Sequence, residues 1–452
     1  MSFASLGQLL PAMRDGAFPV ALRADGEVSL SRLRADVASN LTRLRDVRGR
    51  RALLVTTDAY EFTVGLLMLA HAGWEIVLPP NAQPGTLAAL RGTIDLIVAD
   101  EVIHGVETFT LQSGDGAWSF AAIDPAATRI EFFTSGSTGD PKRITKTLGM
   151  IEAEAAMLEQ RWGSTIGTAS FYGTVGHQHA YGLPFRIIWP LCTGRCFASA
   201  RHHIWNSLLR EMIASGVIIA SPAHLTRLAG VEQLPSARQP RLVFTAGAPL
   251  PSEAAADAAR IFGAPVVEIF GSTDTGIVAW RTGPGMWTPF PGVEVSSNSD
   301  HSTEIRSPFA PGACRLGDRL DISGDGRFHL RGRVDRIAKI EGKRVSLPEL
   351  EQQIARLDFI AEAAVAVIEE QRSFLGAVAV LSAGGRDELS RLGKFRFERR
   401  LRQLLSAEQE LVVLPRRWRF VDRLPSDHMG KCRTADIVAL LALQQEHERR
   451  PA

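Results

Sequence analysis

The first third of the chain alternates short apolar runs with longer segments whose apolar residues recur at helical spacing. Residues 52–56 and 74–78 are typical of buried strands, and residues 61–70 between them are typical of a helix. A further helix is expected over residues 30–37, because the hydroxyl of Ser29 suits an N-cap. Repeated strand–helix pairs of this length predict parallel sheets covered by helices.

The same alternation returns in the middle of the chain, where residues 217–220, 242–245 and 266–270 are short apolar strand candidates. Ligands of open parallel sheets collect at the carboxyl ends of the strands. The polar loops that follow the second and third of these strands are therefore candidate walls of a ligand site.

The pattern changes near Leu320. Asp325-Gly326-Arg327 predicts a hairpin turn, and residues 363–367 and 377–381 are the clearest strands of a smaller α+β segment. The sequence predicts the α/β class, with a large N-terminal domain of mostly parallel, helix-covered sheets and a small, mobile α+β C-terminal domain. We place the boundary near Asp335, which gives domains of residues 1–334 and 335–452.

Composition places the chain among globular proteins of a reducing compartment. At 452 residues it exceeds one ordinary core, and its four cysteines do not suggest a disulfide framework. No apolar run approaches the roughly 20 residues that cross a bilayer, and the first seven residues lack a secretory pattern. We expect a cytoplasmic protein without a membrane span.

Charge is distributed unevenly. From residue 331 onward there are 23 basic and 18 acidic residues, whereas the rest has 28 basic and 31 acidic residues. The excess gathers in residues 394–402 and 416–419, which form either the solvated face of a helix or strand or a docking surface for an acidic partner. Nucleic acid is not expected as a ligand, because the excess is modest and no recognition motif accompanies it.

A hydroxyl- and glycine-rich loop directly follows the apolar run 130–133. It reads Thr134, Ser135, Gly136, Ser137, Thr138, Gly139, Asp140, Pro141, Lys142. Glycines let backbone N–H groups converge, hydroxyls donate to phosphate oxygens, and the lysine adds a cation, so the loop suits a polyphosphate. Its composition also fits an ordinary hairpin turn.

Further motifs follow this loop in a fixed order. They are 177–184, 245–250, 270–276, Gly317-Asp318, 332–345 and 424–431. Together with the loop they resemble, over nearly the whole chain, the adenylate-forming superfamily of acyl-CoA synthetases, luciferases and peptide-synthetase adenylation domains. The resemblance implies activation of a carboxylic acid by ATP with Mg²⁺.

The resemblance also implies a role for each nucleotide-site residue. The 134–142 loop with Lys142 would hold the β,γ-phosphates, and Thr273 and Asp274 would lie near the α-phosphate and Mg²⁺. The family usually has Glu where Asp274 stands, and the shorter arm leaves direct ligation open. The remaining nucleotide residues are Gly247, Ala248, Pro249, Phe270 and Gly271 around the adenine, Asp318 on the ribose and Arg333 beside it.

The resemblance also implies a catalytic lysine and a hinge residue. Lys431, preceded by Gly430, matches the family's catalytic lysine, although by position alone it would be a surface lysine. Asp335 matches the hinge. A mobile lysine would contact the carboxylate and α-phosphate during adenylation and withdraw afterwards.

The acyl pocket is expected around His179, Ala180, Tyr181 and Gly182, which resemble the family's aromatic-lined segment. Amino-acid-activating members carry Asp where Ala180 stands, which argues against an amino acid substrate. His179 also fits a hydrogen-bonded core histidine.

The leading interpretation is an enzyme that converts a small, aromatic carboxylic acid to an acyl-adenylate and then transfers the acyl group to a thiol. The acceptor is coenzyme A or the phosphopantetheine of an acidic acyl carrier protein. The compact length resembles the aryl-acid ligases of bacterial aryl-polyene and xanthomonadin-type pigment clusters. Alternatives are a fatty acyl-CoA ligase, a stand-alone adenylase and a nucleotide-binding regulator of the same fold.

Overall fold

The computed structural model describes most of the chain. The residues outside the description are 1–2, 12–14, 80–81, 83, 104, 135–141, 213, 298–302, 334–335, 341–342, 371–372, 407–408, 410, 426–431 and 449–452. The chain forms two compact units. Unit 1 holds Met1–Glu294 and Ile305–Cys314, and unit 2 holds Val295–Glu304 and Arg315–Ala452.

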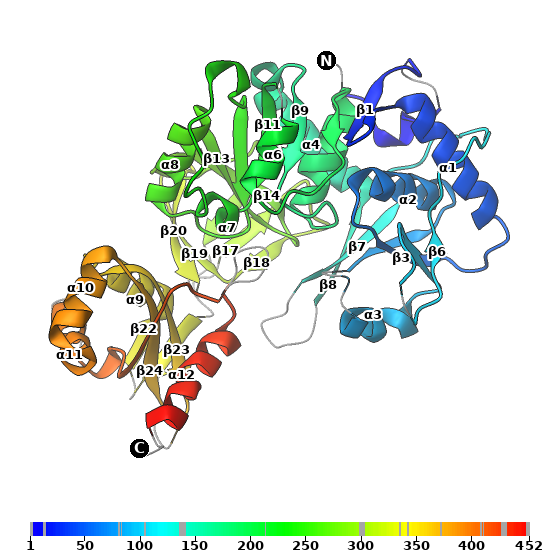
Figure 1. Cartoon of the computed structure of the whole chain (residues 1–452). Helices are drawn as coiled ribbons and strands as arrows, with labels where there is room; N and C mark the ends of the chain where they lie inside the picture. The colour runs from blue at the N-terminus through cyan, green and yellow to red at the C-terminus, as the bar shows by residue number, and fades with distance from the viewer. Residues whose placement is uncertain are drawn as a thin grey trace. The chain divides into compact units, whose positions relative to one another are not determined.

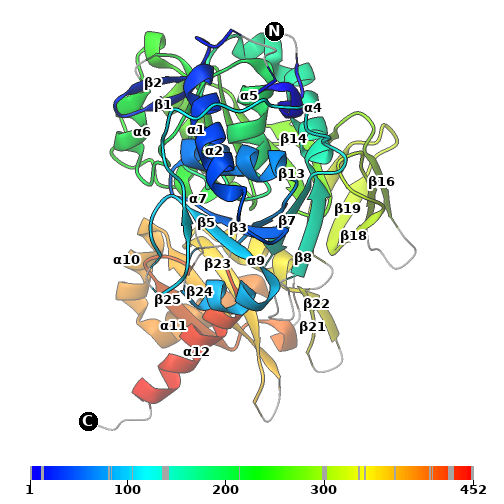
Figure 2. The same ribbon diagram turned by 90° about the vertical axis from the view of Figure 1, so that its right-hand side faces the viewer.

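Unit 1 contains two mainly parallel sheets (Figures 1 and 2). The nine-stranded sheet has the order β15 (Thr288–Pro289), β14 (Gly276–Thr282), β13 (Val266–Ser272), β12 (Leu242–Ala246), β11 (Gly216–Ala220), β9 (Ser170–Gly173), β10 (Phe197–Ala198), β1 (Pro19–Arg23), β2 (Gly26–Ser29). The six-stranded sheet has the order β6 (Phe109–Thr110), β5 (Leu96–Ala99), β3 (Arg51–Val55), β4 (Glu75–Leu78), β7 (Arg129–Thr134), β8 (Lys142–Thr147). Antiparallel pairing is confined to the two ends of the first sheet and to β7–β8.

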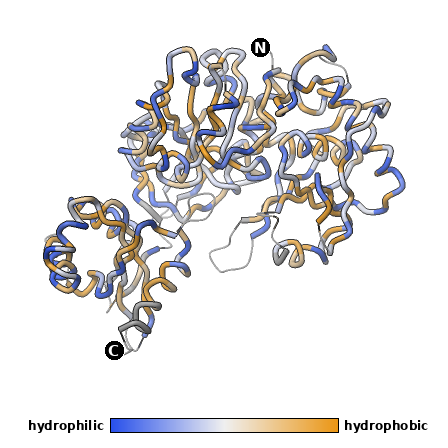
Figure 3. The backbone as a smooth tube through the Cα atoms, in the orientation of Figure 1, coloured by the Kyte–Doolittle hydropathy of each residue, from blue (hydrophilic) through white to orange (hydrophobic). Residues whose placement is uncertain are grey.

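Helices cover the sheets because central strands such as β11 and β12 are buried on both faces. Figure 3 shows hydrophobic segments, in orange, through the interior of unit 1. The helices of unit 1 are α1 (Leu30–Leu44), α2 (Ala59–His71), α3 (Pro84–Leu90), α4 (Leu148–Ile166), α5 (Trp189–Thr193), α6 (Trp205–Glu211), α7 (Pro222–Leu225) and α8 (Ser252–Phe262). A π-helical segment, Leu183–Ile188, precedes α5. Short 3₁₀ turns span Leu6–Gln8, Arg91–Thr93 and Ser236–Arg238.

One apolar core joins the two sheets. It combines strand residues of both sheets with residues of α1, α2 and α4, such as Leu54, Phe62, Leu158 and Phe244. The outer face of the nine-stranded sheet packs against α6 and α8, and the outer face of the six-stranded sheet packs against α3. The two sheets are therefore held as a single layered body.

Local sequence signals fix where several helices begin. The side chain of Ser29 accepts a hydrogen bond from the backbone N–H of Arg32, Asp58 caps α2, and Thr147 caps α4. The predicted strands at 52–56, 74–78, 217–220, 242–245 and 266–270 are confirmed, with each end within two residues of its predicted position. The predicted helices over 30–37 and 61–70 are also confirmed, and the first extends seven residues further, to Leu44.

Unit 2 is a smaller α+β structure. Its strands form the pairs β19 (Asp318–Ile322) with β20 (Phe328–Arg333) and β21 (Ile337–Ile340) with β22 (Lys343–Ser346), and the sheet β23 (Ile360–Ile368), β24 (Phe374–Leu381), β25 (Arg417–Val421). Helices α9 (Leu347–Ala355) and α11 (Lys394–Leu405) pack on one face of this sheet, and α12 (Thr434–Glu448) packs on the other. Helix α10 (Ala383–Leu392) and a 3₁₀ turn, Leu411–Val413, complete the unit.

The predicted hairpin turn at Asp325-Gly326-Arg327 is confirmed between β19 and β20. A three-stranded sheet, β16 (Glu294–Ser297), β17 (Thr303–Arg306) and β18 (Cys314–Leu316), contains the positions at which the chain passes from one unit to the other. The predicted fold class is confirmed. The functional boundary at residues 334/335 stays a prediction, because these two residues lie outside the described ones.

None of the helices in the described ranges is both long enough and apolar enough to cross a membrane.

Candidate active site

The predicted phosphate loop connects two antiparallel strands. Strands β7 and β8 pair with Thr134 opposite Lys142, so the loop is a hairpin that leaves and re-enters the six-stranded sheet at one place. Ser135, Gly136, Ser137, Thr138 and Gly139 lie outside the described residues, as does the side chain of Thr134. The structure therefore places the base of the loop, and the phosphate contacts stay a prediction.

A second hairpin brings another predicted motif to the base of this loop. Strands β13 and β14 meet at a tight turn that carries Thr273 and Asp274. The Asp274 carboxylate lies 2.6 Å from the Lys142 ammonium, although the two residues are 132 positions apart in the chain. The Lys142 side chain is 61% exposed and that of Asp274 is 29% exposed, so solvent and small ligands can reach this ion pair.

A buried ion pair stabilises the same turn from the protein interior. The Lys146 ammonium of β8 donates to the Glu154 carboxylate of α4 at 2.9 Å, and the two side chains are 2% and 3% exposed. Glu154 also accepts a hydrogen bond from the backbone N–H of Ile277, directly after the turn. Burial raises the pKa of Glu154, against the opposing effect of the Lys146 charge.

Gly276 makes this contact possible. It has a φ of +69°, and a Cβ at this position would lie 2.7 Å from a Glu154 carboxylate oxygen. Only glycine adopts this backbone conformation readily while leaving room for the carboxylate. The pair thus links the phosphate hairpin, α4 and the turn that bears Thr273 and Asp274.

The predicted acyl segment follows β9 as a compact loop. Gly182 packs so closely that a Cβ would lie 1.9 Å from the carbonyl oxygen of Gly176. Ala180 and Tyr181 are half-buried and pack against the core that joins the two sheets, and His179 is also half-buried. The four predicted substrate residues thus lie in one tight turn.

His177 belongs to the same loop and was not among the predicted site residues. It is 2% exposed, its ring lies 4.6 Å from that of Phe62, and its Nε2 lies 3.2 Å from the hydroxyl of Thr56 at the end of β3. Burial, followed by the charge of Arg186, holds the pKa of His177 well below its ordinary value of 6.5. The imidazole is therefore neutral at physiological pH.

Three polar atoms of this loop are buried without a hydrogen-bond partner among the described residues: the Oγ1 of Thr174, the Nδ1 of His177 and the hydroxyl of Tyr181. Burial raises the pKa of Tyr181 well above its ordinary value, so the hydroxyl stays protonated. Buried polar atoms are nearly always paired in folded proteins. These three atoms are exceptions to that rule.

Arg186 holds the loop from inside the protein. Its guanidinium is 1% exposed and donates to the carbonyl oxygens of Val175, Ala198 and Ala200 at 2.6, 3.2 and 3.0 Å. Burial lowers the pKa of Arg186 to about 10, which still leaves it charged. The loop is therefore anchored through its backbone, and its sequence pattern gave no signal of this.

The predicted adenine wall lies at the carboxyl ends of neighbouring strands. Gly247, Ala248 and Pro249 directly follow β12, while Phe270 and Gly271 end the adjacent β13. The ring of Phe270 lies 5.7 Å from that of Trp287. The small residues and the aromatic ring thus occur at adjacent strand ends, as expected for a site at this edge.

Unit 2 carries the remaining predicted residues. Asp318 begins β19 opposite Arg333 of β20, and the hydroxyl of Thr303 donates to the Asp318 carbonyl oxygen at 2.6 Å. Ribose binding by Asp318 and the role of Arg333, whose side chain is not described, stay predictions. Asp335 and Lys431 lie outside the described residues.

The residues around Asp274 fit Mg²⁺ only if substrate phosphates supply the other ligands of the ion. In the described part of the chain, no group of three or more His, Cys, Asp or Glu side chains could hold a metal ion. Asp274 offers one carboxylate beside the Thr273 hydroxyl. This donor set matches an ion held by one or two carboxylates together with substrate phosphates.

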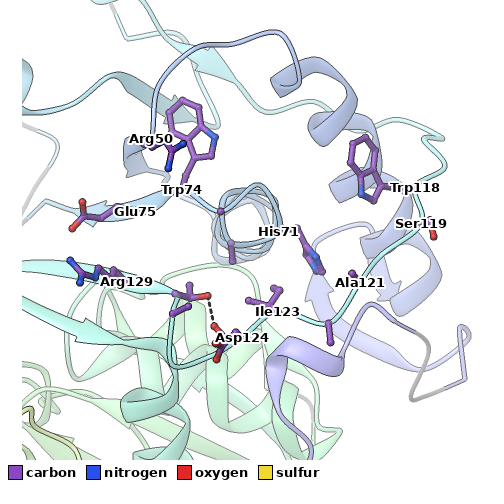
Figure 4. A pocket seen from close by; sticks show the side chains of 15 residues that line it. Arg50, His71, Trp74, Glu75, Trp118, Ser119, Ala121, Ile123, Asp124 and Arg129 are labelled. Carbon is purple, nitrogen blue, oxygen red and sulfur yellow. Dashed lines mark hydrogen bonds between the residues drawn. The ribbon is translucent and has the colours of Figure 1, made fainter.

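A cavity of about 530 Å³ lies elsewhere in unit 1 (Figure 4). It is lined by the end of α2 with His71, by Trp74 and Glu75 of the β4 region, and by the segment from Trp118 to Arg129. None of the predicted site residues lines it. We therefore base the candidate site on the hairpins and the acyl loop.

Known proteins resemble this chain in both sequence and fold. The profile of the "AMP-binding enzyme" family matches residues 68–300, just over half of the chain. A 4-coumarate–CoA ligase of Rhodobacter capsulatus is 25% identical over 308 residues, covering 68% of this chain and 75% of the relative. A p-hydroxybenzoic acid–AMP ligase of Mycobacterium tuberculosis is 27% identical over 391 residues, covering 78% of this chain and 54% of the relative.

Among solved structures, the ATP-bound MatB of Rhodopseudomonas palustris superposes with a TM-score of 0.79 at 19% identity, covering 99% of both chains. At this identity the likeness concerns the fold.

The buried pair generates a stability prediction. Glu154→Gln should lower the free energy of unfolding by about 3–5 kcal/mol, because it leaves the buried Lys146 ammonium without a counter-charge. Urea unfolding measures the loss, and Glu232→Gln at an exposed position is the matched control. The double variant Lys146→Met/Glu154→Leu should recover most of the loss. A cost below about 1 kcal/mol for Glu154→Gln would contradict the assigned role.

Proposed function

Because this chain belongs to the AMP-binding enzyme family, we propose that it activates a carboxylic acid with ATP and passes the acyl group to the thiol of coenzyme A. The observation that carries this proposal is the contact between Lys142 and Asp274. Two motifs far apart in the sequence, a phosphate-loop base and an acidic turn, meet there at 2.6 Å.

In the first step a carboxylate oxygen attacks the α-phosphorus of ATP, and pyrophosphate leaves. Negative charge develops on the phosphoryl oxygens, so preorganised donors and cations lower the barrier. We assign the phosphate contacts to the 134–142 loop with Lys142, the α-phosphate contact to Thr273 and the catalytic cation to Lys431. Gly247, Phe270 and Asp318 would hold the nucleoside.

In the second step the thiol attacks the acyl carbonyl carbon, the acyl–phosphate bond breaks and AMP leaves. Coenzyme A is the acceptor that we favour, since the 4-coumarate relative uses it by name. A carrier-protein phosphopantetheine is the second candidate, and the basic excess of the chain from residue 331 onward favours it. The p-hydroxybenzoic acid–AMP ligase relative supports a stand-alone adenylase as the third.

The acid is proposed to be aromatic and to carry a polar group on its ring. The support is the acyl loop, where the neutral His177 and Tyr181 leave one buried nitrogen and one buried hydroxyl without partners among the described residues. A ring hydroxyl could donate to the nitrogen or accept from the tyrosine. A fatty acid would leave both atoms unsatisfied, which costs free energy. 4-Coumarate and p-hydroxybenzoic acid, named in the two relatives, both carry a ring hydroxyl.

Mg²⁺ is proposed to neutralise phosphate charge during adenylation. Asp274 would supply one oxygen ligand, directly or through water. Its contact with the ion would then replace part of its contact with Lys142. The lysine would be released toward the phosphates. The ion pair thus keeps both groups in place before the nucleotide binds.

The first test is pyrophosphate exchange across a panel of hydroxylated aromatic, unsubstituted aromatic and aliphatic acids. We expect exchange with hydroxylated aromatic acids, and Lys431→Ala should slow it about 10²-fold or more, as loss of a transition-state donor does. Lys394→Ala, at the start of α11, is the matched control. Exchange by Lys431→Ala within tenfold of the parent would remove the assignment of Lys431.

The second test concerns the metal. Asp274→Asn should lower the exchange rate and raise the Mg²⁺ concentration that gives half-maximal activity, since a neutral amide binds the ion more weakly. Lys142→Met breaks the same ion pair without altering the carboxylate, so it should leave the Mg²⁺ requirement near that of the parent. Equal Mg²⁺ requirements for Asp274→Asn and the parent would exclude the carboxylate from the metal site.

The third test concerns the proposed hinge. Reusing one pocket for two steps requires a residue that changes φ and ψ widely between poses. Proline fixes φ near −65°, so Asp335→Pro should spare adenylate formation while slowing thioester formation at least tenfold more. Asp335→Ala keeps the backbone free and should retain both steps. Equal losses in the two steps would count against a rotating domain.

A further inference from the structure

A groove on unit 2 has no role in the chemistry described above. It has a volume of about 480 Å³ and lies along α11 and the 3₁₀ turn Leu411–Val413. Its lining includes Phe395, Arg399, Arg402, Gln403, Leu411 and Arg416. None of the predicted catalytic or nucleotide residues that the structure describes lines it.

Helix α11 has two distinct apolar features. Phe397, Leu401 and Leu405 recur at four-residue spacing and are buried in the core of unit 2. Phe395 lies outside this stripe and is 79% exposed, and Leu411 nearby is 62% exposed. Large apolar side chains exposed beside a groove are typical of interaction sites.

Positive charge surrounds these apolar side chains. Arg396 and Arg399 are exposed, and neither forms an ion pair within the described ranges of the chain. Burial and then the charge of Arg416 lower the pKa of Arg402, so two guanidinium groups repel each other in the groove wall. Carboxylates of a ligand would be attracted to the exposed guanidinium groups of Arg396 and Arg399.

We infer that this groove docks an acidic protein that places an apolar side chain between Phe395 and Leu411 and carboxylates on Arg396 and Arg399. Arginine and aromatic side chains are the residues that contribute most to protein interfaces. Planar guanidinium groups also bind carboxylates through two parallel hydrogen bonds. A carrier protein would be a partner of this kind, but the docking surface does not depend on the proposed acid chemistry.

Two other classes of partner fit less well. Nucleic acid presents a continuous row of phosphates, whereas this groove places two large exposed apolar side chains, Phe395 and Leu411, among its arginines. A membrane surface would meet a broad apolar face, whereas this site is a hollow with two exposed apolar side chains.

The test measures binding of the full chain to a purified holo-acyl carrier protein by fluorescence anisotropy. We expect binding that Arg396→Glu/Arg399→Glu weakens at least tenfold, that Phe395→Ala weakens at least threefold, and that rising salt weakens. Arg45→Glu/Arg48→Glu, at exposed positions of unit 1, makes the same change in net charge and should alter binding less than twofold.

Three results would overturn the inference. They are no binding by the parent protein, equal weakening by the two charge-reversal variants, and tighter binding of single-stranded DNA or anionic phospholipid vesicles with the same dependence on Arg396 and Arg399. Thermal unfolding shows whether each variant is folded. Pyrophosphate exchange should remain unchanged in the groove variants, so failure of the docking site and failure of the proposed acid activation are measured separately.

Discussion

The buried ion pair between Lys146 and Glu154 is the contact on which the candidate active site depends. Two charges removed from water require close geometry and further hydrogen bonds, and Glu154 obtains one from the N–H of Ile277. The pair fixes β8, α4 and the β13–β14 turn at one point. The exposed pair of Lys142 and Asp274 lies on the elements that this buried pair joins, so a strong interior contact positions a weak, exchangeable one.

The acyl loop is stabilised differently, because the buried guanidinium of Arg186 binds backbone carbonyl oxygens and not a carboxylate. Arg186 donates to three carbonyl oxygens, and burial, followed by the charge of Arg186, lowers the pKa of His177 and keeps it neutral. The Nδ1 of His177 and the hydroxyl of Tyr181 stay buried in this loop without a partner among the described residues. The proposed preference for a hydroxylated acid rests on these two atoms, because hydrogen bonds to a substrate hydroxyl select more sharply than apolar contact alone.

Helix α11 of unit 2 has one face that packs in the core and another that is exposed. The stripe of Phe397, Leu401 and Leu405 stabilises α11 against its sheet, whereas Phe395 and the exposed arginines contribute nothing to that core. These exposed side chains, which the core of unit 2 does not use, form the surface from which the docking of an acidic protein is inferred.

The sequence by itself determined the fold class, most strand and helix positions, the hairpin at Asp325-Gly326-Arg327 and the family. These depend on periodicity, caps, turns and ordered motifs, which are local properties of the chain. It also indicated the phosphate loop and the acidic turn, but not that Lys142 would contact Asp274 across 132 positions. Only the tertiary structure decided that pairing, the burial of Lys146, Glu154 and Arg186, and the neutral state of His177. Ion pairing and desolvation depend on which residues share an interior, and local patterns along the chain do not reveal this.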